Sequence, residues 1–308
     1  MDQPQAQQGD APLEATSRSG FVGIVGRPNV GKSTILNFFL GQKIAIVSPR
    51  PQTTRKRIVG VLTRDQAQVI FLDSPGLHEA KRPLGRSMVK IAGGIIEEAD
   101  VILAVIDATR SLTREDAWVF QHLRHAKGSP ILVINKVDLA KKPLILPLIK
   151  AAQEHATFAE YIPVSALTGE QMPVLLDAII ARLPTGPRWY DAAHVTDQTS
   201  QELVGEFIRE QVLLATRQEV PQSVAVLIEA MEDRDRVLDI HAIILVERPG
   251  QKAIVIGKGG LMLKQIGQAA RREIERLLGR HVNLQLWVKV AKDWRGDPRI
   301  LRELGYEA

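Results

Sequence analysis

Cysteine is absent from this chain of 308 residues. Its absence excludes a disulfide framework and a cysteine-ligated zinc site, and it fits a reducing compartment. The seven histidines show no ligand spacing either, because His122 and His125 lack partner carboxylates or thiols. We therefore expect no structural metal site.

Long apolar runs and targeting signals are also missing. No run approaches the roughly 20 apolar residues that span a bilayer. Residues 1–19 are rich in Gln, Pro, Ala and Ser, and they lack both the basic and the apolar region of a signal peptide. We expect these residues to form a flexible tail and the protein to be cytoplasmic.

The net charge of +5 is small but unevenly spread. Residues 202–248 hold five basic and ten acidic side chains, whereas residues 252–302 hold twelve basic and four acidic ones, a local excess of +8. A basic segment of this kind is typical of a surface that binds a polyanion, and a solvated surface is the alternative.

Short apolar runs alternate with amphipathic stretches from Phe21 to about Pro184. Runs rich in Val and Ile indicate buried strands, and the stretches between them indicate helices. This alternation predicts an α/β domain with a doubly wound, mainly parallel sheet over residues 20–184, followed by a polar linker at 185–200. The expected strands are FVGIVG, VIFLD, VILAVID, ILVINK and YIPVSA, and the expected helices contain STILNFFLG, RSMVKIAGGIIEEA, TREDAWVFQHLRHA and VLLDAIIARL.

A different pattern occupies residues 201–308. Its elements follow in the order α-β-β, then a glycine-rich turn, then α-β, which predicts a small α+β domain. The expected helices are 202–217 and 261–278, and the expected strands are 223–231, 237–247 and 282–290.

The stretch from Gly26 to Ser33 has the P-loop pattern G-x-x-x-x-G-K-S between an expected strand and an expected helix. Glycines allow consecutive backbone N–H groups to surround phosphate oxygens, and the helix N-terminus adds partial positive charge. Lys32 is expected to reach the β- and γ-phosphates, and the Ser33 hydroxyl to bind Mg²⁺. The expected nucleotide contacts here are Gly26, Asn29, Val30, Gly31, Lys32, Ser33 and Thr34.

Two further motifs follow expected strands. In Asp73-Ser-Pro-Gly76 the carboxylate of Asp73 can hold Mg²⁺ through a water and the Gly76 N–H can sense a γ-phosphate, although turns often contain these residue types. Asn135-Lys-Val-Asp138 indicates guanine. The Asp138 carboxylate can accept the N1–H and the N2 amine together, a donor pair that adenine lacks.

The remaining expected base contacts surround Asp138. Asn135 would brace the loop and contact the base, and the aliphatic stem of Lys136 would cover the ring. A backbone N–H at the end of the next expected strand would meet the guanine O6. The residues expected at that position are Ser165, Ala166 and Leu167.

Together, the P-loop, the motif at 73–76, the motif at 135–138 and the strand end at 165–167 resemble the translation-factor-like GTPases. The resemblance covers residues 21–184. It implies a switch threonine that contacts Mg²⁺ within Gln52-Thr-Thr-Arg55; Thr54 is favoured, with Thr53 as the alternative. The resemblance also implies a Mg²⁺ site and a set of catalytic residues. The implied Mg²⁺ ligands are Ser33, Thr54 and Asp73, and the implied catalytic residues are Lys32, Ser33, Thr54, Asp73 and Gly76.

Hydrolysis is expected to be slow. The position after Gly76, where Ras-like proteins carry a water-orienting glutamine, is Leu77, which cannot form a hydrogen bond. Asn29 matches the asparagine that helps to bind K⁺ in several relatives, so K⁺ stimulation is a hypothesis; a purely loop-stabilising role for Asn29 is the alternative.

The segment Ile256-Gly-Lys-Gly-Gly260 resembles the G-x-x-G loop of a type II KH domain, which binds single-stranded RNA. Glycines there allow close approach of a nucleic-acid backbone, and Lys258 can pair with a phosphate. Ile254, Ile256 and Ile266 would form the groove floor. Trp287 is interpreted as a packing residue and Trp294 as exposed. The expected RNA contacts are Ile256, Gly257, Lys258, Gly259, Gly260 and Lys264.

A P-loop GTPase domain joined to a C-terminal type II KH domain resembles the Era family of bacterial GTPases. The likeness rests on GRPNVGKST, PQTTR, DSPGLHE, NKVD, VERPGQKAIVIGKGG and LWVKV, and it covers all but the tail. It implies GTP and GDP as ligands, with Mg²⁺. We expect a monomer without an obligate protein partner. The likeness also implies binding near the 3′ end of 16S rRNA and a role in 30S assembly, and it leaves open peripheral attachment to the inner face of the membrane.

Two rival functions are the alternatives at this point, and the sequence disfavours the second. A GTP-regulated adaptor could use the KH fold to contact protein or membrane, and an ATP-driven RNA remodeller is disfavoured by Asn135 and Asp138. The switch-region cations Arg50, Arg55, Lys56 and Arg57 are interpreted mainly as solvated, with contact to RNA phosphates as the alternative.

Overall fold

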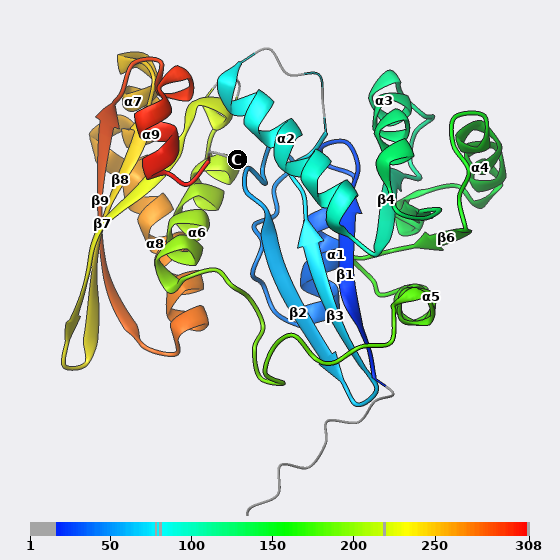
Figure 1. The fold of residues 1–308 in the computed structure, drawn as a ribbon. Coiled ribbons are helices and arrows are strands. Elements are labelled where there is room, and N and C mark those ends of the chain that lie inside the picture. Colours follow the sequence, from blue (N-terminus) through cyan, green and yellow to red (C-terminus); the bar gives the residue numbers. More distant parts are fainter. Residues whose placement is uncertain (1–16, 78, 80–81, 218–219, 307–308) are drawn as a thin grey trace, which may run out of the picture.

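The computed structural model describes residues 17–77, 79, 82–217 and 220–306, which form two domains side by side (Figure 1). The first domain holds a six-stranded sheet in the order β2-β3-β1-β4-β5-β6. All neighbouring strands are parallel except β2, which is antiparallel to β3. Its elements are β1 (Arg18–Val25), α1 (Lys32–Leu40), β2 (Ile58–Arg64), β3 (Ala67–Asp73), α2 (Pro83–Glu98), β4 (Val101–Asp107), α3 (Arg114–His122), β5 (Ile131–Asn135), α4 (Ile145–Gln153), β6 (Glu160–Val164) and α5 (Met172–Arg182).

Both faces of this sheet are covered by helices. Leu103 of β4 packs in the core shared with α1 and α5, whereas its neighbour Ala104 packs in the core shared with α2, α3 and α4. Successive strand residues thus enter opposite cores, which explains why the strands read as continuous apolar runs. The expected doubly wound α/β fold is confirmed.

The first domain contains two elements that the sequence analysis did not anticipate, the strand β2 and the helix α4. β2 is an edge strand, and the chain after the first domain runs along its free side. The Val61 N–H donates to the Val195 carbonyl at 2.8 Å, and the Thr196 hydroxyl donates to the Val59 carbonyl at 2.7 Å. The segment at 185–200 is therefore packed against the sheet and does not hang free.

The boundary of the N-terminal tail needs a correction. β1 begins at Arg18, so the tail expected over residues 1–19 extends too far; residues 1–16 lie outside the described residues. The cause is pairing with the end of the domain. The Ser17 hydroxyl donates to the Gly186 carbonyl at 2.9 Å, and the Arg18 side chain donates to the Leu183 carbonyl at 2.8 Å.

The second domain holds a three-stranded sheet in the order β7-β8-β9, covered on one face by two long helices. β7 and β8 are antiparallel, and β9 is parallel to β8. The expected small α+β domain is confirmed. Its elements are α6 (Ser200–Ala215), β7 (Ala225–Arg234), β8 (Val237–Val246), α7 (Pro249–Ile256), α8 (Leu261–Leu278), β9 (His281–Val290) and α9 (Pro298–Glu303).

Helix α7 was not anticipated, because its β-branched run does not favour a helix. Its first turn stabilises it: Pro249 occupies the first position, and the Gln251 side chain accepts the N–H of Arg248 at 3.0 Å. Val255 is fully buried in the core of the second domain. Tertiary packing and capping therefore outweigh the local propensity.

Two tryptophan expectations are wrong. Trp294 is fully buried and donates its indole N–H to the Ser223 carbonyl at 2.8 Å, so the polar sequence around it gave a false impression of exposure. Trp287 is 46% exposed, because alternation along β9 directs it to the face of the sheet opposite the helices.

Candidate functional site

The P-loop joins β1 to α1, and its conformation requires glycine at Gly31. Gly31 precedes the helix with φ of 101°, and a Cβ there would lie 2.2 Å from the Asn135 amide nitrogen. Lys32 is buried, and its ammonium donates to the carbonyls of Gly26 at 3.1 Å and Arg27 at 3.0 Å. Burial lowers the pKa of Lys32 to about 8, against the opposing effect of a nearby carboxylate.

Ser33, Thr54 and Asp73 meet at the start of α1. The Ser33 hydroxyl donates to the Asp73 carboxylate at 2.6 Å and lies 2.9 Å from the Thr54 hydroxyl. Thr53 points elsewhere, because its hydroxyl donates to the Arg50 carbonyl at 2.7 Å. Among the described residues, the second carboxylate oxygen of Asp73 is buried without a hydrogen-bond partner, and burial raises the pKa of Asp73 to about 6.

The D-x-x-G turn packs directly on the P-loop. A Cβ on Gly76 would lie 2.8 Å from the backbone nitrogen and Cα of Pro28, so only glycine fits. The next residue, Leu77, is fully buried in the core on the α2 face, and its N–H donates to the Gly26 carbonyl at 3.1 Å. The leucine side chain thus fills the core and does not face the P-loop.

Asn135 connects the P-loop to the loop that follows β6. Its amide donates to the Val30 carbonyl at 2.9 Å, and its carbonyl accepts the Ala166 N–H at 3.0 Å. The Asp138 carboxylate is exposed, and no hydrogen bond joins it to another described residue. The Leu167 side chain is also exposed, at 77%, whereas Ser165 is fully buried.

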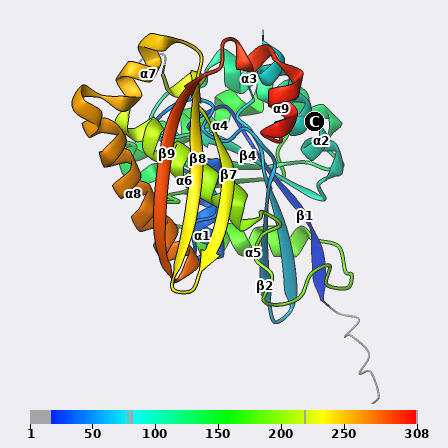
Figure 2. The same ribbon diagram turned by 90° about the vertical axis from the view of Figure 1, so that its left-hand side faces the viewer.

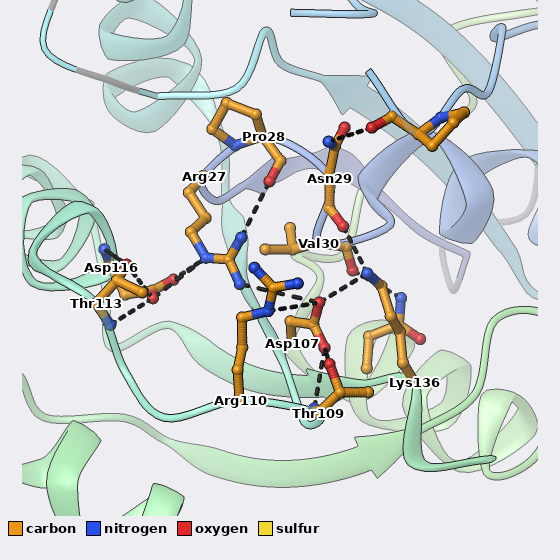
Figure 3. A network of polar contacts seen from close by, with 12 residues as sticks. Arg27, Pro28, Asn29, Val30, Asp107, Thr109, Arg110, Thr113, Asp116 and Lys136 are labelled. Atoms are coloured by element: carbon orange, nitrogen blue, oxygen red, sulfur yellow. Dashed lines mark hydrogen bonds and ion pairs between the residues drawn. The ribbon is translucent and has the colours of Figure 1, made fainter. Parts of the chain in front are cut away.

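An acidic residue that the sequence analysis missed holds Lys136. Asp107, at the end of β4, accepts the Lys136 ammonium at 2.7 Å and the Thr109 hydroxyl at 2.6 Å (Figure 3). Although burial opposes it, these hydrogen bonds lower the pKa of Asp107. Lys136 also donates to the Asn29 carbonyl at 2.7 Å. The signal was available, since an acid ended the expected strand VILAVID.

A second buried acid, Asp116, fixes the P-loop arginine. The Arg27 guanidinium donates to Asp116 at 3.1 Å, and Asp116 also forms the capping box of α3 with Thr113 (Figure 3). A side chain that caps a helix and holds a charged partner fixes both in place. Nothing in the sequence pattern pointed to this role.

The switch segment 46–54 lies over the P-loop. The Asn29 side chain, on a residue with φ of 63°, donates to the Pro49 carbonyl at 2.9 Å. The pocket between the two segments measures about 50 Å³. Asn29 therefore ties the two loops together in this conformation.

Arg55, which directly follows this segment, anchors it in the second domain. Its side chain is fully buried and donates to the carbonyls of Val224 at 2.7 Å and Gln222 at 3.1 Å. The guanidinium also lies 5.6 Å from the Trp294 ring centroid and 5.7 Å from that of Tyr306. Burial lowers the pKa of Arg55 to about 10, with nearby Arg209 adding to the effect.

Helix α6 supplies the matching contacts. Arg209 is fully buried and donates to the Thr53 carbonyl, and Glu210 accepts the Val47 N–H at 2.8 Å and the Lys43 ammonium at 2.5 Å. Although burial opposes it, Glu206 raises the pKa of Arg209. The switch backbone is therefore held by buried charged groups of the second domain.

The interpretation of the switch cations as mainly solvated is wrong. Arg50 donates to the Thr216 carbonyl at 2.9 Å, and Lys56 pairs with Glu202 at 3.2 Å. Both partners, Thr216 and Glu202, belong to the second domain. Arg57 pairs with Glu98 of the first domain at 2.5 Å. These basic side chains, like Arg55, serve contacts within the protein.

The glycine-rich loop joins α7 to α8. Gly257, Gly259 and Gly260 have φ of 72°, 58° and 80°. A Cβ on Gly257 would lie 2.6 Å from the Met262 Cβ, whereas the positions above Gly259 and Gly260 are open. The Lys258 side chain is exposed. The loop thus presents bare backbone beside a lysine.

A groove of about 440 Å³ runs from this loop between α8 and β9. The expected floor is partly wrong, because Ile266 is buried in the core and Ile254 is 50% exposed on α7. Leucines from α8 and β9 line the groove where these isoleucines were expected. The groove is lined by Gly260, Leu263, Lys264, Gly267, Gln268, Arg271, Asn283, Leu284 and Leu286.

Comparison with protein families identifies the two domains separately. Residues 21–136 match the family described as 50S ribosome-binding GTPase, and residues 219–295 match the KH domain family. The predicted pairing of a GTPase domain with a KH domain is confirmed.

Whole-chain relatives share this arrangement. The chain is 49% identical over 297 residues to GTPase Era of Leuconostoc citreum, covering 95% of this chain and 98% of that protein. It is 47% identical over 291 residues to GTPase Era of Syntrophus aciditrophicus, covering 94% and 95%.

Two solved structures are similar over nearly the whole chain, each at 43% identity. One is an Era variant from Aquifex aeolicus bound to GDP and AlF4⁻, with a TM-score of 0.91 over 94% of this chain and 100% of that one. The other is Era in complex with MgGDPNP and nucleotides 1506–1542 of 16S ribosomal RNA, with a TM-score of 0.92 over 95% and 100%.

Proposed function

Because this chain belongs to the GTPase Era family, we propose that it binds small-subunit rRNA near its 3′ end and assists assembly of the 30S subunit. It is a GTPase, which converts GTP to GDP and phosphate. The observation that carries the proposal is the groove between α8 and β9. It joins a bare glycine loop to a leucine-lined floor with Lys264 and Arg271 on its wall, and it lies in the domain that the RNA-bound relative shares.

We propose GTP and GDP as the ligands of the P-loop, with Mg²⁺ held by Ser33, Thr54 and Asp73. The unpartnered buried oxygen of Asp73 fits a cation or its bound water. Mg²⁺ bound there would neutralise charge on the phosphates. Lys32, already directed at the loop carbonyls, would exchange them for phosphate oxygens.

Guanine specificity is proposed to rest on Asp138. Its exposed carboxylate can accept the paired donors of guanine, while Asn135 keeps the P-loop and the Ala166 loop at a fixed separation. Lys136 is held across the site by Asp107 and the Asn29 carbonyl, which positions its stem to cover a ring.

The chemistry is proposed to be slow without assistance. The Leu77 side chain is buried, so the position that carries the water-orienting glutamine in Ras-like proteins contributes no polar group. Stimulation by a K⁺ ion beside Asn29 is part of this proposal, and stabilisation of the loop through the hydrogen bond from Asn29 to the Pro49 carbonyl is the alternative.

We propose that the nucleotide controls the RNA groove through residues 53–55. Thr54 faces the proposed Mg²⁺ site, while its neighbours Thr53 and Arg55 contact the second domain. A change in the position of Thr54 on hydrolysis would therefore disturb buried contacts of Arg55. GTP would favour a domain arrangement that exposes the groove, and hydrolysis would release the RNA.

The test is to crosslink the protein to RNA in cells and sequence the bound RNA. Gly259→Asp should abolish reads at the 3′ end of small-subunit rRNA, because a carboxylate there repels phosphates. Gly279→Asp is the matched control, since Gly279 has a similar φ of 64° and open space above it but lies at the far end of α8. Reads that are scattered in the parent and unchanged in Gly259→Asp would contradict the proposal.

A cytoplasmic monomer without an obligate protein partner is proposed as the working form. No helix in the described part of the chain is long and apolar enough to cross a membrane. Peripheral attachment to the inner membrane face would be tested by flotation with liposomes. An adaptor that binds protein through the KH fold would differ in salt response, because several Lys/Arg–phosphate contacts make RNA binding weaken steeply as salt rises.

A further inference from the structure

The face of the second sheet opposite α6 and α8 carries an aromatic pair, an exposed Trp287 and a half-buried His241. The Trp287 ring on β9 stacks on the His241 ring on β8, with 5.5 Å between centroids and 19° between planes. His241 pairs with Gln285 in the strand register, so Trp287 lies two residues further along the same face. Figure 2 looks onto this face of the sheet, with the two long helices behind it.

The RNA groove lies immediately across β9 from this pair. Leu284 and Leu286 line the groove, and Trp287, next in sequence, points to the other side. β9 is an edge strand in the order β7-β8-β9. A strand of RNA that leaves the groove over this edge meets the Trp287 ring first.

The surroundings of Trp287 suit a nucleobase. Gln285 and the exposed Lys289 lie on the same face at intervals of two residues, about 6.6 Å each. The neighbouring Ile243 is partly buried and packs under α9 with a separate cluster. A single exposed indole between an amide and an ammonium group is typical of base stacking with phosphate pairing, whereas protein docking needs a broader apolar patch.

We propose that Trp287, supported by His241, stacks on one base of the RNA strand outside the groove, with Lys289 paired to a flanking phosphate. This inference rests on the proposed binding of RNA in the groove. It extends the footprint beyond the roughly four nucleotides that a G-x-x-G groove holds. The platform tolerates any base, because every base has a π-face.

The test compares RNA of two lengths on the full chain. Trp287→Ala should weaken binding of a twelve-nucleotide strand by about 5- to 150-fold, the range that corresponds to stacking of one base. It should leave binding of a four-nucleotide strand, measured by competition, unchanged. Trp287→Phe should retain most of the affinity. Trp189→Ala is the control, since Trp189 is 62% exposed but lies outside the second domain.

An abasic scan of the longer RNA then locates the base. One abasic position outside the groove should weaken binding to the parent and have no further effect on Trp287→Ala. Equal losses for both RNA lengths would mean that Trp287 only supports the fold, and no loss for the longer RNA would also overturn the platform. If the parent binds neither RNA, the proposed function itself fails.

Discussion

Arg55 donates a 2.7 Å hydrogen bond to the carbonyl oxygen of Val224, across the boundary between the two domains. Its neighbour Thr54 lies 2.9 Å from the P-loop serine. One peptide unit thus separates a side chain at the proposed Mg²⁺ site from a side chain buried in the KH domain. This adjacency would give a bound nucleotide a short mechanical route to the proposed RNA groove.

Arg55→Met should uncouple the domains. The substitution leaves the carbonyls of Val224 and Gln222 without their donor, which costs about 1–3 kcal/mol for each buried group. Thermal unfolding should therefore occur at a lower temperature, and RNA affinity should no longer depend on the nucleotide. Arg57→Met, which loses a contact to Glu98 within the first domain, is the control. Unaltered nucleotide dependence in Arg55→Met would contradict the route.

Asp138→Asn should change the preferred base. Xanthine carries an oxygen where guanine carries the N2 amine, so an amide at position 138 can pair with it. GTP affinity should fall more than about 100-fold and xanthosine triphosphate should bind instead. Stability should be unaffected, because the side chain is exposed. Retained preference for guanine over xanthine would refute the assignment.

Asp73 should give stability a characteristic pH dependence in nucleotide-free protein. Burial raises the folded-state pKa of Asp73 to about 6 from 3.8. The contribution of Asp73 to the free energy of unfolding is therefore fully present below about pH 4, and it is lost as the pH rises through 6. Across that pH window, the free energy of unfolding of the parent should fall by up to about 3 kcal/mol relative to that of Asp73→Asn. Mg²⁺ with GTP should stabilise the parent at pH 7.5 but not the variant, as followed by chemical denaturation. Parallel pH profiles for the two proteins would contradict this.

Gly76→Ala should damage the site by steric conflict. The new Cβ would meet the Pro28 backbone at 2.8 Å, so the two loops must separate. We expect a loss of about 1–3 kcal/mol of stability and a strong reduction in GTP turnover. Gly94→Ala, on the exposed side of α2 with open space around it, should instead be neutral or slightly stabilising. A fully active Gly76→Ala protein would show that the loops do not need this contact.

Turnover should be faster in K⁺ than in Na⁺ if Asn29 helps to hold a cation. Asn29→Gly removes the side chain without straining the backbone, since φ is 63° there, and should abolish the difference. Identical rates for the parent in the two salts would leave Asn29 as the tie to Pro49 alone.

Motif order predicted most of the first domain, because parallel strands bring their carboxyl ends to one edge and so gather the P-loop, Asp73 and Asn135. The same reasoning could not separate Thr53 from Thr54. Both sit in an irregular segment whose course is set by contacts more than 150 residues away, such as that of Arg209 with the Thr53 carbonyl.

Long-range burial also explains the other failures. Arg55 and Trp294 lie in polar sequence, yet they bury each other at the domain boundary, which no local pattern reports. Asp107 and Asp116 were overlooked for a different reason. Lys136, the partner of Asp107, follows β5, and Arg27, the partner of Asp116, follows β1. These pairs therefore form only in the folded chain.

The most direct test of the whole account is the affinity of the protein for an RNA fragment from the 3′ end of 16S rRNA, measured with a non-hydrolysable GTP analogue and again with GDP. Coupling through residues 53–55 predicts binding that is about 5- to 150-fold tighter with the analogue, the usual range for linked sites. Equal affinity in the two nucleotide states would contradict the account, because the switch would then exert no control over the groove.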